Sequence, residues 1–290
     1  EAEELSVFPG MGELFSLMEI RNYSRTSDYD VVIVDCAPTG DTLRLLSAPE
    51  ITGWYLKHIF PIQRTAARAV RPVASRVLPF PFPDDNVFGA MKKLTAQLSE
   101  MKTILEDTQK TSIRLVINPE KMVIKEAQRA YSFFSLFGYG VDMIIVNRNI
   151  PQSVGDPYFE KWKAIQETYR NQIAESFSPI PIFFLPLFNQ EIVGIPQLDR
   201  VADCLYGQSD PAELFFARKP VQIAKEDGGF VLSISLPFAK KKDLDIVQKG
   251  EELFIRVGPV KRNILLPRVL LNRRVKSARF EKERLKISFE

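Results

Sequence analysis

The chain has 290 residues, of which 45% are hydrophobic and 26% are charged, a composition typical of folded proteins rather than of disordered or fibrous ones. Its 39 basic and 36 acidic residues leave a net charge of +3, so the charge balance gives no reason to expect a nucleic-acid partner. The two cysteines, Cys36 and Cys204, lie far apart in the sequence, which excludes a disulfide framework and predicts a reducing compartment such as the cytoplasm.

The first residues are acidic where a secretory signal would be basic and then apolar. Since no apolar run reaches the roughly 18 residues of a membrane span, we expect a protein that is neither exported nor membrane-spanning. The chain starts without methionine and in what resembles the middle of an element, so we expect a fragment of a longer protein.

The first predicted strand is an apolar run from Val31 to Val34 that is followed by Asp35. A short continuous run of this kind is typical of a strand buried on both faces. An aspartate at the carboxyl end of such a strand is where P-loop ATPases hold Mg²⁺, usually through water, and the turn at Thr39-Gly40 can offer backbone N–H groups to a phosphate. The alternative is a polar residue that caps an ordinary turn.

Three further apolar runs follow along the chain, at 113–117, 141–146 and 180–185. Because the stretches between them carry helical periodicity, the sequence predicts an α/β fold with a doubly wound, mostly parallel sheet.

Two of the expected helices carry start signals. Asn118-Pro119-Glu120 predicts a helix that Gly138 can end, and Asp156-Pro157 repeats the device. The second helix has apolar residues near helical spacing that should pack on the sheet: Phe159, Trp162, Tyr169, Ile173 and Phe177. A further amphipathic helix is expected around 91–105.

The segment 54–83 contains five basic residues and no acidic one, and it is rich in aromatic residues and proline. We interpret it as part of a helical insert at about 54–110. It is either a cap on the core or a contact for a client protein or a membrane surface, because basic amphipathic stretches suit both roles.

Beyond residue 219 the helical periodicity stops and alternation begins, around 230–236, 253–257, 263–266 and 285–289. These strands and their Gly-rich turns predict a small all-β sandwich at 219–290, after an α/β domain at 1–218.

The run Val-Ile-Val-Asp-Cys-Ala-Pro-Thr-Gly-Asp-Thr-Leu-Arg-Leu-Leu-Ser at 32–47 resembles the switch II signature of the arsenite-stimulated and tail-anchored-protein-targeting ATPases, a P-loop NTPase family. The similarity continues through 9–13, 116–122, 146–148 and 186–194, in the family's order. The C-terminal part resembles the α-crystallin-type domain of small heat shock proteins, on Leu236-Pro237-Phe238, Gly250-Glu251-Glu252-Leu253 and 262–267.

The resemblance implies roles for particular residues. Asp35 would lie in the Mg²⁺ shell, and Thr39 and Gly40 would sense the γ-phosphate of ATP. Asn147 would recognise the adenine edge, although a cap at a strand end is the alternative. Two more positions complete the set: Pro186 and Leu187 would line the adenine pocket through their backbone, and Glu120 falls in a motif near the nucleotide and the dimer face, without a firm role.

For the intact protein, the resemblance implies a homodimer in the cytoplasm or plastid stroma that uses ATP to handle or target hydrophobic client proteins or membrane-anchor segments, with peripheral membrane contact. However, no Gly-x-x-x-x-Gly-Lys-[Ser/Thr] loop occurs in the 290 residues, so we expect this chain alone not to hydrolyse ATP. One alternative is an ATP-independent chaperone or scaffold with a vestigial nucleotide site. Another, an arsenite or oxyanion efflux ATPase, is disfavoured because the cysteines lack neighbours.

Overall fold

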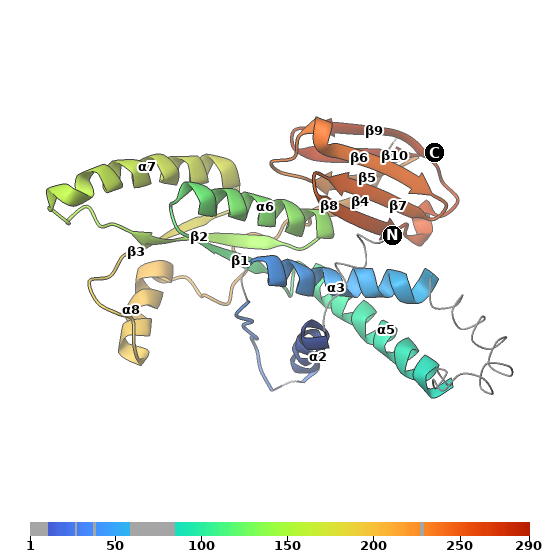
Figure 1. Cartoon of the computed structure of the whole chain (residues 1–290), viewed down its shortest axis with the longest axis horizontal. Helices are drawn as coiled ribbons and strands as arrows, with labels where there is room; N and C mark the ends of the chain where they lie inside the picture. The colour runs from blue at the N-terminus through green and yellow to red at the C-terminus, as the bar shows by residue number, and fades with distance from the viewer. Residues whose placement is uncertain (1–10, 27, 37–38, 59–84, 227–228) are drawn as a thin grey trace, which may run out of the picture. The chain divides into compact units, whose positions relative to one another are not determined.

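The computed structural model describes residues 11–26, 28–36, 39–58, 85–226 and 229–290 (Figure 1). They fall into two compact units, Glu1–Leu105 and Glu106–Glu290. Within the described residues, no helix is both long enough and apolar enough to span a bilayer.

The helices described in the first unit are α2 (Met11–Arg25), α3 (Thr39–His58) and α5 (Asp85–Glu106), the last of which ends at the boundary to the second unit. Ion pairs join α5 to both other helices, from Arg21 to Glu100 at 2.6 Å and from Lys102 to Glu50 at 3.2 Å. The helix predicted around 91–105 is confirmed within α5, whose buried side chains include Leu98, Met101 and Leu105. Most of the basic segment 54–83, including Arg64, Arg68, Arg71 and Arg76, lies outside the described residues.

The strand predicted at Val31 to Asp35 is wrong. Residues 31–36 belong to no sheet, and the side chains of Val31 and Ile33 are 51% and 89% exposed. A buried strand needs neighbours that pair with its backbone N–H and C=O groups. Among the described residues no backbone group pairs with this segment, so its apolar side chains face outward.

The first part of the second unit is built on a parallel sheet of β1 (Ile113–Ile117), β2 (Val141–Asn149) and β3 (Ile182–Pro186), in that order. All three predicted strands are confirmed, although the third begins two residues later. Helices α6 (Lys121–Phe137) and α7 (Pro157–Phe177) run along one side of the sheet and α8 (Ile195–Tyr206) along the other (Figure 1). Helices on both sides of parallel strands confirm the doubly wound α/β prediction.

Helix α6 ends as predicted but begins later. Gly138 follows it in the left-handed region, at φ 86°, and its N–H donates to the carbonyls of Phe134 and Ser135. At the other end, Glu120 is extended, at φ −134°, so the helix starts at Lys121 rather than at Pro119. Asn118 accepts from the N–H of Glu120 at 2.8 Å and thus closes a tight turn instead of capping the helix.

Helix α7 starts as predicted, because the carboxylate of Asp156 accepts from the N–H of Tyr158 at 2.8 Å. The prediction for its apolar face is half correct. Ile173 and Phe177 are buried, whereas Trp162 is 49% exposed. Only the C-terminal half of this face packs within the unit.

The described C-terminal residues form two antiparallel sheets, with strand orders β4-β5-β10-β9 and β6-β7-β8. Their strands are β4 (Val221–Glu226), β5 (Gly229–Ser235), β6 (Leu244–Lys249), β7 (Glu252–Val257), β8 (Val260–Leu265), β9 (Val275–Glu281) and β10 (Arg284–Phe289). Alternating side chains are buried between them: Leu232, Ile234, Leu253, Ile255, Leu285, Ile287 and Phe289. The four predicted strands are confirmed, and β4, β6 and β9 complete the β-sandwich.

The segment that joins α8 to the sandwich is held against β1 by Arg114. Its guanidinium donates to the carbonyls of Pro211, at 2.7 Å, and Glu213, at 2.9 Å. The same group lies 3.4 Å from the carboxylate of Asp142, whose side chain is 1% exposed. A buried carboxylate and two backbone carbonyls therefore share one cation.

Candidate functional site

Three of the predicted site residues lie in the first unit. Asp35 is exposed in the segment 31–36, which belongs to no sheet, and Thr39 and Gly40 begin α3. The intervening residues 37–38 and the side chain of Thr39 lie outside the described part of the chain. Backbone N–H groups at the start of a helix carry partial positive charge, so the position of Thr39 and Gly40 suits an anion.

Next to Asp35, partial burial raises the pKa of the Cys36 thiol. A hydrogen bond with Thr42 acts in the opposite direction, while the negative charge of Asp35 raises this pKa further. By the accessible surface of the whole residue, both Cys36 and Cys204 are exposed.

The other predicted site residues lie in the second unit and share one edge of the parallel sheet. Glu120 follows the end of β1, Asn147 lies near the end of β2, and Pro186 ends β3, with Leu187 next to it. Because parallel strands end at the same edge, the fold brings these residues together. The side chain of Glu120 is exposed and caps no helix N–H, so it gains no firm role from its position.

A local irregularity in β2 sets the orientation of Asn147. The pairing of β2 with β3 shifts between Val146 and Asn149, and Arg148 adopts a left-handed backbone, at φ 55°. The side-chain oxygen of Asn147 accepts from the N–H of Arg148 at 2.8 Å. Its amide nitrogen donates to no group in the described part of the chain, and the residue is half-buried.

The amide of Asn147 therefore offers two donors and a remaining acceptor site at the sheet edge. Adenine presents a matching N–H₂ donor beside a ring-nitrogen acceptor, which an asparagine amide can bind in a bidentate manner. The exposed Leu187 next to it adds apolar surface. This geometry fits recognition of a purine base.

Two residues of this edge carry no signal that sequence reasoning could use. Asn149 is 8% exposed, and its amide nitrogen donates to the carbonyls of Val146, at 2.6 Å, and Leu185, at 2.9 Å. Gln166 on α7 accepts from the N–H of Ile150 at 2.9 Å and donates to the carbonyl of Arg148 at 3.2 Å. Their roles depend on the shift in β2, which no sequence pattern indicates.

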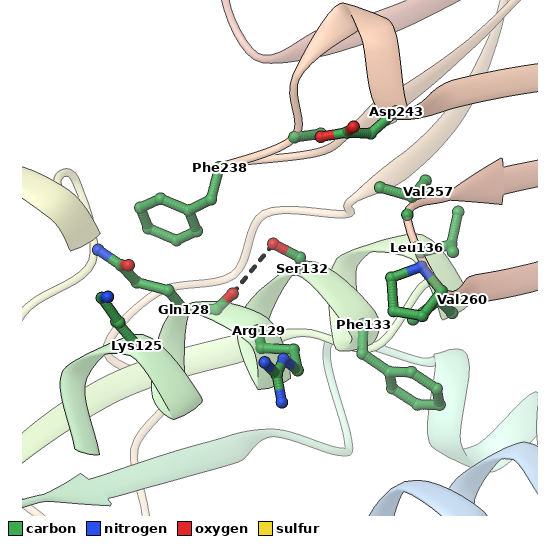
Figure 2. Close-up of a pocket in the computed structure, with 13 residues that line it drawn as sticks. Lys125, Gln128, Arg129, Ser132, Phe133, Leu136, Phe238, Asp243, Val257 and Val260 are labelled. Carbon is green, nitrogen blue, oxygen red and sulfur yellow. Dashed lines mark hydrogen bonds between the residues drawn. The ribbon is translucent and has the colours of Figure 1, made fainter. Parts of the chain in front are cut away.

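A cleft of about 260 Å³ lies elsewhere in the second unit, between α6 and the sandwich (Figure 2). Its polar lining includes Lys125, Gln128, Ser132 and Asp243, and the ring of Phe238 closes one side. None of the predicted site residues lines it, so this cleft and the motif residues are in different places.

The cleft lies along a packed seam that joins α6 to the sandwich. Phe238, at φ 67°, packs edge-on against Tyr131 and Phe177, with ring centroids 6.2 and 5.7 Å away. The Oγ of Ser132 lies 2.6 Å from the carbonyl of Pro237 and also reaches that of Gln128, the bond drawn in Figure 2. Burial is the main cause that raises the pKa of Tyr131.

On the same seam, the guanidinium of Arg262 in β8 is 4% exposed and lies at the C-terminal end of α6. It donates to the carbonyl of Leu136, lies 3.2 Å from the carboxylate of Glu106, and stacks over the ring of Phe137 at 5.5 Å. A cation at this end of a helix interacts favourably with the helix dipole.

Comparison with known proteins agrees with this architecture. Residues 1–207 match the family model described as anion-transporting ATPase, and residues 227–289 match an HSP20-like domain found in ArsA. The chain is 39% identical to a putative arsenical pump-driving ATPase 1 of Aquifex aeolicus, over 99% of this chain and 73% of that protein. It is 35% identical to a putative arsenical pump-driving ATPase of Chlorobaculum tepidum, over 100% of this chain and 72% of the relative.

A more distant relative is an ATPase ASNA1 homolog of Trypanosoma cruzi, 28% identical over 70% of this chain and 58% of that protein. The first family match covers the α/β part of the chain and the second covers the β-sandwich. The chain therefore belongs to the ArsA family of anion-transporting ATPases and carries an HSP20-like domain at its C-terminal end.

Proposed function

We propose that this chain supplies the base-recognition edge and the switch segment of an ATPase that uses Mg·ATP to handle hydrophobic client proteins. The observation that carries the proposal is the juxtaposition of Asn147 with Pro186 and Leu187 at the carboxyl edge of the sheet. The similarity to ASNA1 homologues supports the same assignment. In the intact protein we propose a homodimer, located in the cytoplasm or the plastid stroma.

The phosphate end of the site is incomplete in these 290 residues, because they contain no Gly-x-x-x-x-Gly-Lys-[Ser/Thr] loop. When bound, Mg²⁺ would neutralise charge on the transferred phosphoryl group. Asp35, which is exposed, would hold it through water, and Thr39 and Gly40 would face the phosphate. Without the loop's lysine and backbone N–H groups, we propose that the chain alone binds adenine weakly and does not hydrolyse ATP.

The test of base recognition uses adenosine, observed by saturation-transfer difference NMR with the 290-residue chain. We expect binding that weakens about fivefold or more in Asn147→Ala, since a bidentate base contact contributes at least that factor. Asn171→Ala, an exposed asparagine on α7, is the matched control and should bind normally. If the wild type shows no adenosine signal, the assignment of this edge is wrong.

The proposed lack of hydrolysis is tested by phosphate release from ATP and Mg²⁺. Turnover that persists through purification and is abolished in Asp35→Ala would overturn it.

The HSP20-like match favours a second candidate, an ATP-independent chaperone. Suppression of aggregation of a model substrate without ATP, lost when residues 220–290 are deleted, would support this candidate. Oxyanion efflux is disfavoured, although two relatives are named as putative arsenical pump-driving ATPases, because among the described residues neither cysteine belongs to a group of three or more potential metal ligands.

A further inference from the structure

We infer that Asn149 is a positioning residue that holds the two halves of the base-recognition edge, the turn at Asn147 and the loop at Pro186-Leu187, in one geometry. The inference rests on the proposed function, because it concerns the same edge of the sheet. It adds a residue that contacts the base through neither its side chain nor its backbone.

The hydrogen bonds of the Asn149 side chain reach both halves of the edge. One acceptor is the carbonyl of Val146, at 2.6 Å, in the peptide bond that leads into Asn147. The other is the carbonyl of Leu185, at 2.9 Å, in the peptide bond that leads into Pro186. One amide group therefore fixes the two peptide bonds that precede the predicted base contacts.

The backbone of Asn149 closes the same connection. Its carbonyl accepts from the N–H of Leu187 at 2.7 Å, and Asn149 is the register partner of Pro186. Between Val146 and Asn149 the regular pairing is interrupted, so these bonds replace the ladder where the register shifts.

The chemistry of the side chain explains why asparagine is needed here. Two carbonyl acceptors require two N–H donors on one planar group, which a carboxylate cannot provide. The side-chain oxygen is buried and has no donor among the described residues, so burial alone does not favour an asparagine at this position.

Gln166 supports the turn from the other side. It accepts from the N–H of Ile150 and donates to the carbonyl of Arg148, the two residues that flank Asn149. Because Arg148 has a left-handed backbone, which costs a non-glycine residue conformational energy, outside contacts are required to hold it. Helix α7 thus stabilises the same turn that aims Asn147 at the edge.

The first experiment tests, without any ligand, whether Asn149 holds the turn at Asn147 and the loop at Pro186-Leu187 together; this connection is called the clamp. Amide hydrogen exchange by NMR should show a protected Leu187 N–H in the wild type. In Asn149→Asp, the loss of hydrogen bonds should raise the equilibrium constant for local opening about tenfold, and exchange at Leu187 should speed up by the same factor. Unchanged protection would overturn the inference whatever the nucleotide results.

The second experiment measures the consequence for recognition, as the ratio of adenosine to guanosine affinity. We expect the wild type to prefer adenosine about fivefold or more, and Asn149→Asp to bring this ratio close to one. A purely structural role would weaken both nucleosides equally and leave the ratio unchanged, which would also overturn the inference. Asn171→Asp, the same substitution at an exposed position of α7, should retain the preference.

Because Asn149 is buried, its variant could fail to fold. A second variant, at Gln166, therefore tests the same turn without changing a buried residue. Gln166 is half-buried, and Gln166→Glu keeps the acceptor for Ile150 but loses the donor to Arg148. It should lower the adenosine preference while thermal melting stays at the wild-type value; an unchanged preference would contradict the inference. If exchange at Leu187 responds but the wild type binds no adenosine, the clamp between the loops stands and the proposed function fails.

Discussion

The thiol of Cys36 reports on the charge of its neighbour Asp35. Partial burial raises the pKa of the thiol, and the carboxylate of Asp35 raises it further because a second negative charge nearby is unfavourable. The thiolate, which is the nucleophile, is therefore scarcer at Cys36 than at a thiol without these neighbours.

Replacing Asp35 with asparagine should speed alkylation of Cys36 by iodoacetamide at pH 8. Loss of the negative charge lowers the pKa of the thiol and raises the thiolate fraction, by about twofold since solvent screens an exposed carboxylate. The rate is measured by mass spectrometry in a Cys204→Ser background. Asp30→Asn, at an exposed position in the same stretch, should leave the rate unchanged, and a slower rate in Asp35→Asn would contradict the assigned charge effect.

At single positions, the sequence predicted the residues of the proposed base-recognition edge but gave no indication of Asn149, the residue that we propose positions them. Asn147 and Pro186 could be proposed from the resemblance to the ATPase family, and the parallel strands bring them to a common edge. Asn149 could not, since its burial depends on the irregular pairing after Val146 and on the left-handed backbone of Arg148. Neither feature has a sequence signal as clear as a glycine or proline.

Among the elements, the end of α6 is the one for which sequence and structure agree most closely. Gly138 takes the left-handed conformation that an ending helix requires, and an added Cβ would meet its nearest atom, in Glu106, at an ordinary 3.6 Å. The requirement for glycine therefore comes from the left-handed backbone conformation and not from a steric clash of an added Cβ with its neighbours.

Gly138→Ala should destabilise the second unit by about 1–2 kcal/mol, the cost of a left-handed backbone for a residue with a Cβ. Urea denaturation followed by circular dichroism measures this change in the free energy of unfolding. Gly155→Ala is the matched control, because an added Cβ there meets no atom within 4 Å and φ is not positive. Equal effects of the two substitutions would show that the cap conformation is not what costs stability.

Other elements show what a sequence window leaves out. The runs at 113–117 and 141–146 became strands because they pair with each other, whereas the equally apolar run at Val31 has no partner in the described part of the chain. Helix α6 begins after Glu120 because Asn118 closes a turn of its own. The apolar pattern of a segment indicates which secondary structure its side chains favour. Whether the segment becomes a strand also depends on a neighbouring strand that pairs with its backbone.

At the scale of the whole second unit, the α/β region and the sandwich pack against each other along the seam at α6. Arg262 brings a buried cation to the C-terminal end of α6, and Phe238 inserts between α6 and α7. Since α6 begins next to Glu120, at the edge that carries Asn147, one helix links the base edge to the sandwich.

Arg262→Met should therefore destabilise the second unit by about 2 kcal/mol, because it orphans the carbonyl of Leu136 and removes a cation from the helix end. Thermal unfolding of the full chain, with fluorescence and circular dichroism compared, measures the change. Arg256→Met, on the neighbouring strand, breaks only an exposed pair with Asp245 and should cost below about 1 kcal/mol. If both variants melt alike, the seam contributes little to stability.

The segment that joins α8 to the sandwich, which Arg114 holds against β1, determines where this protein can be divided into modules. A division after Gly207 separates Arg114 from the carbonyls of Pro211 and Glu213, and also separates Asp142 from the N–H of Phe215. The carboxylate of Asp142 would then stay buried with fewer partners, an arrangement that is costly. The structural unit formed by the α/β region accordingly extends past α8. A recombination event that exchanges the sandwich and keeps these hydrogen bonds has to join the chain beyond Phe215.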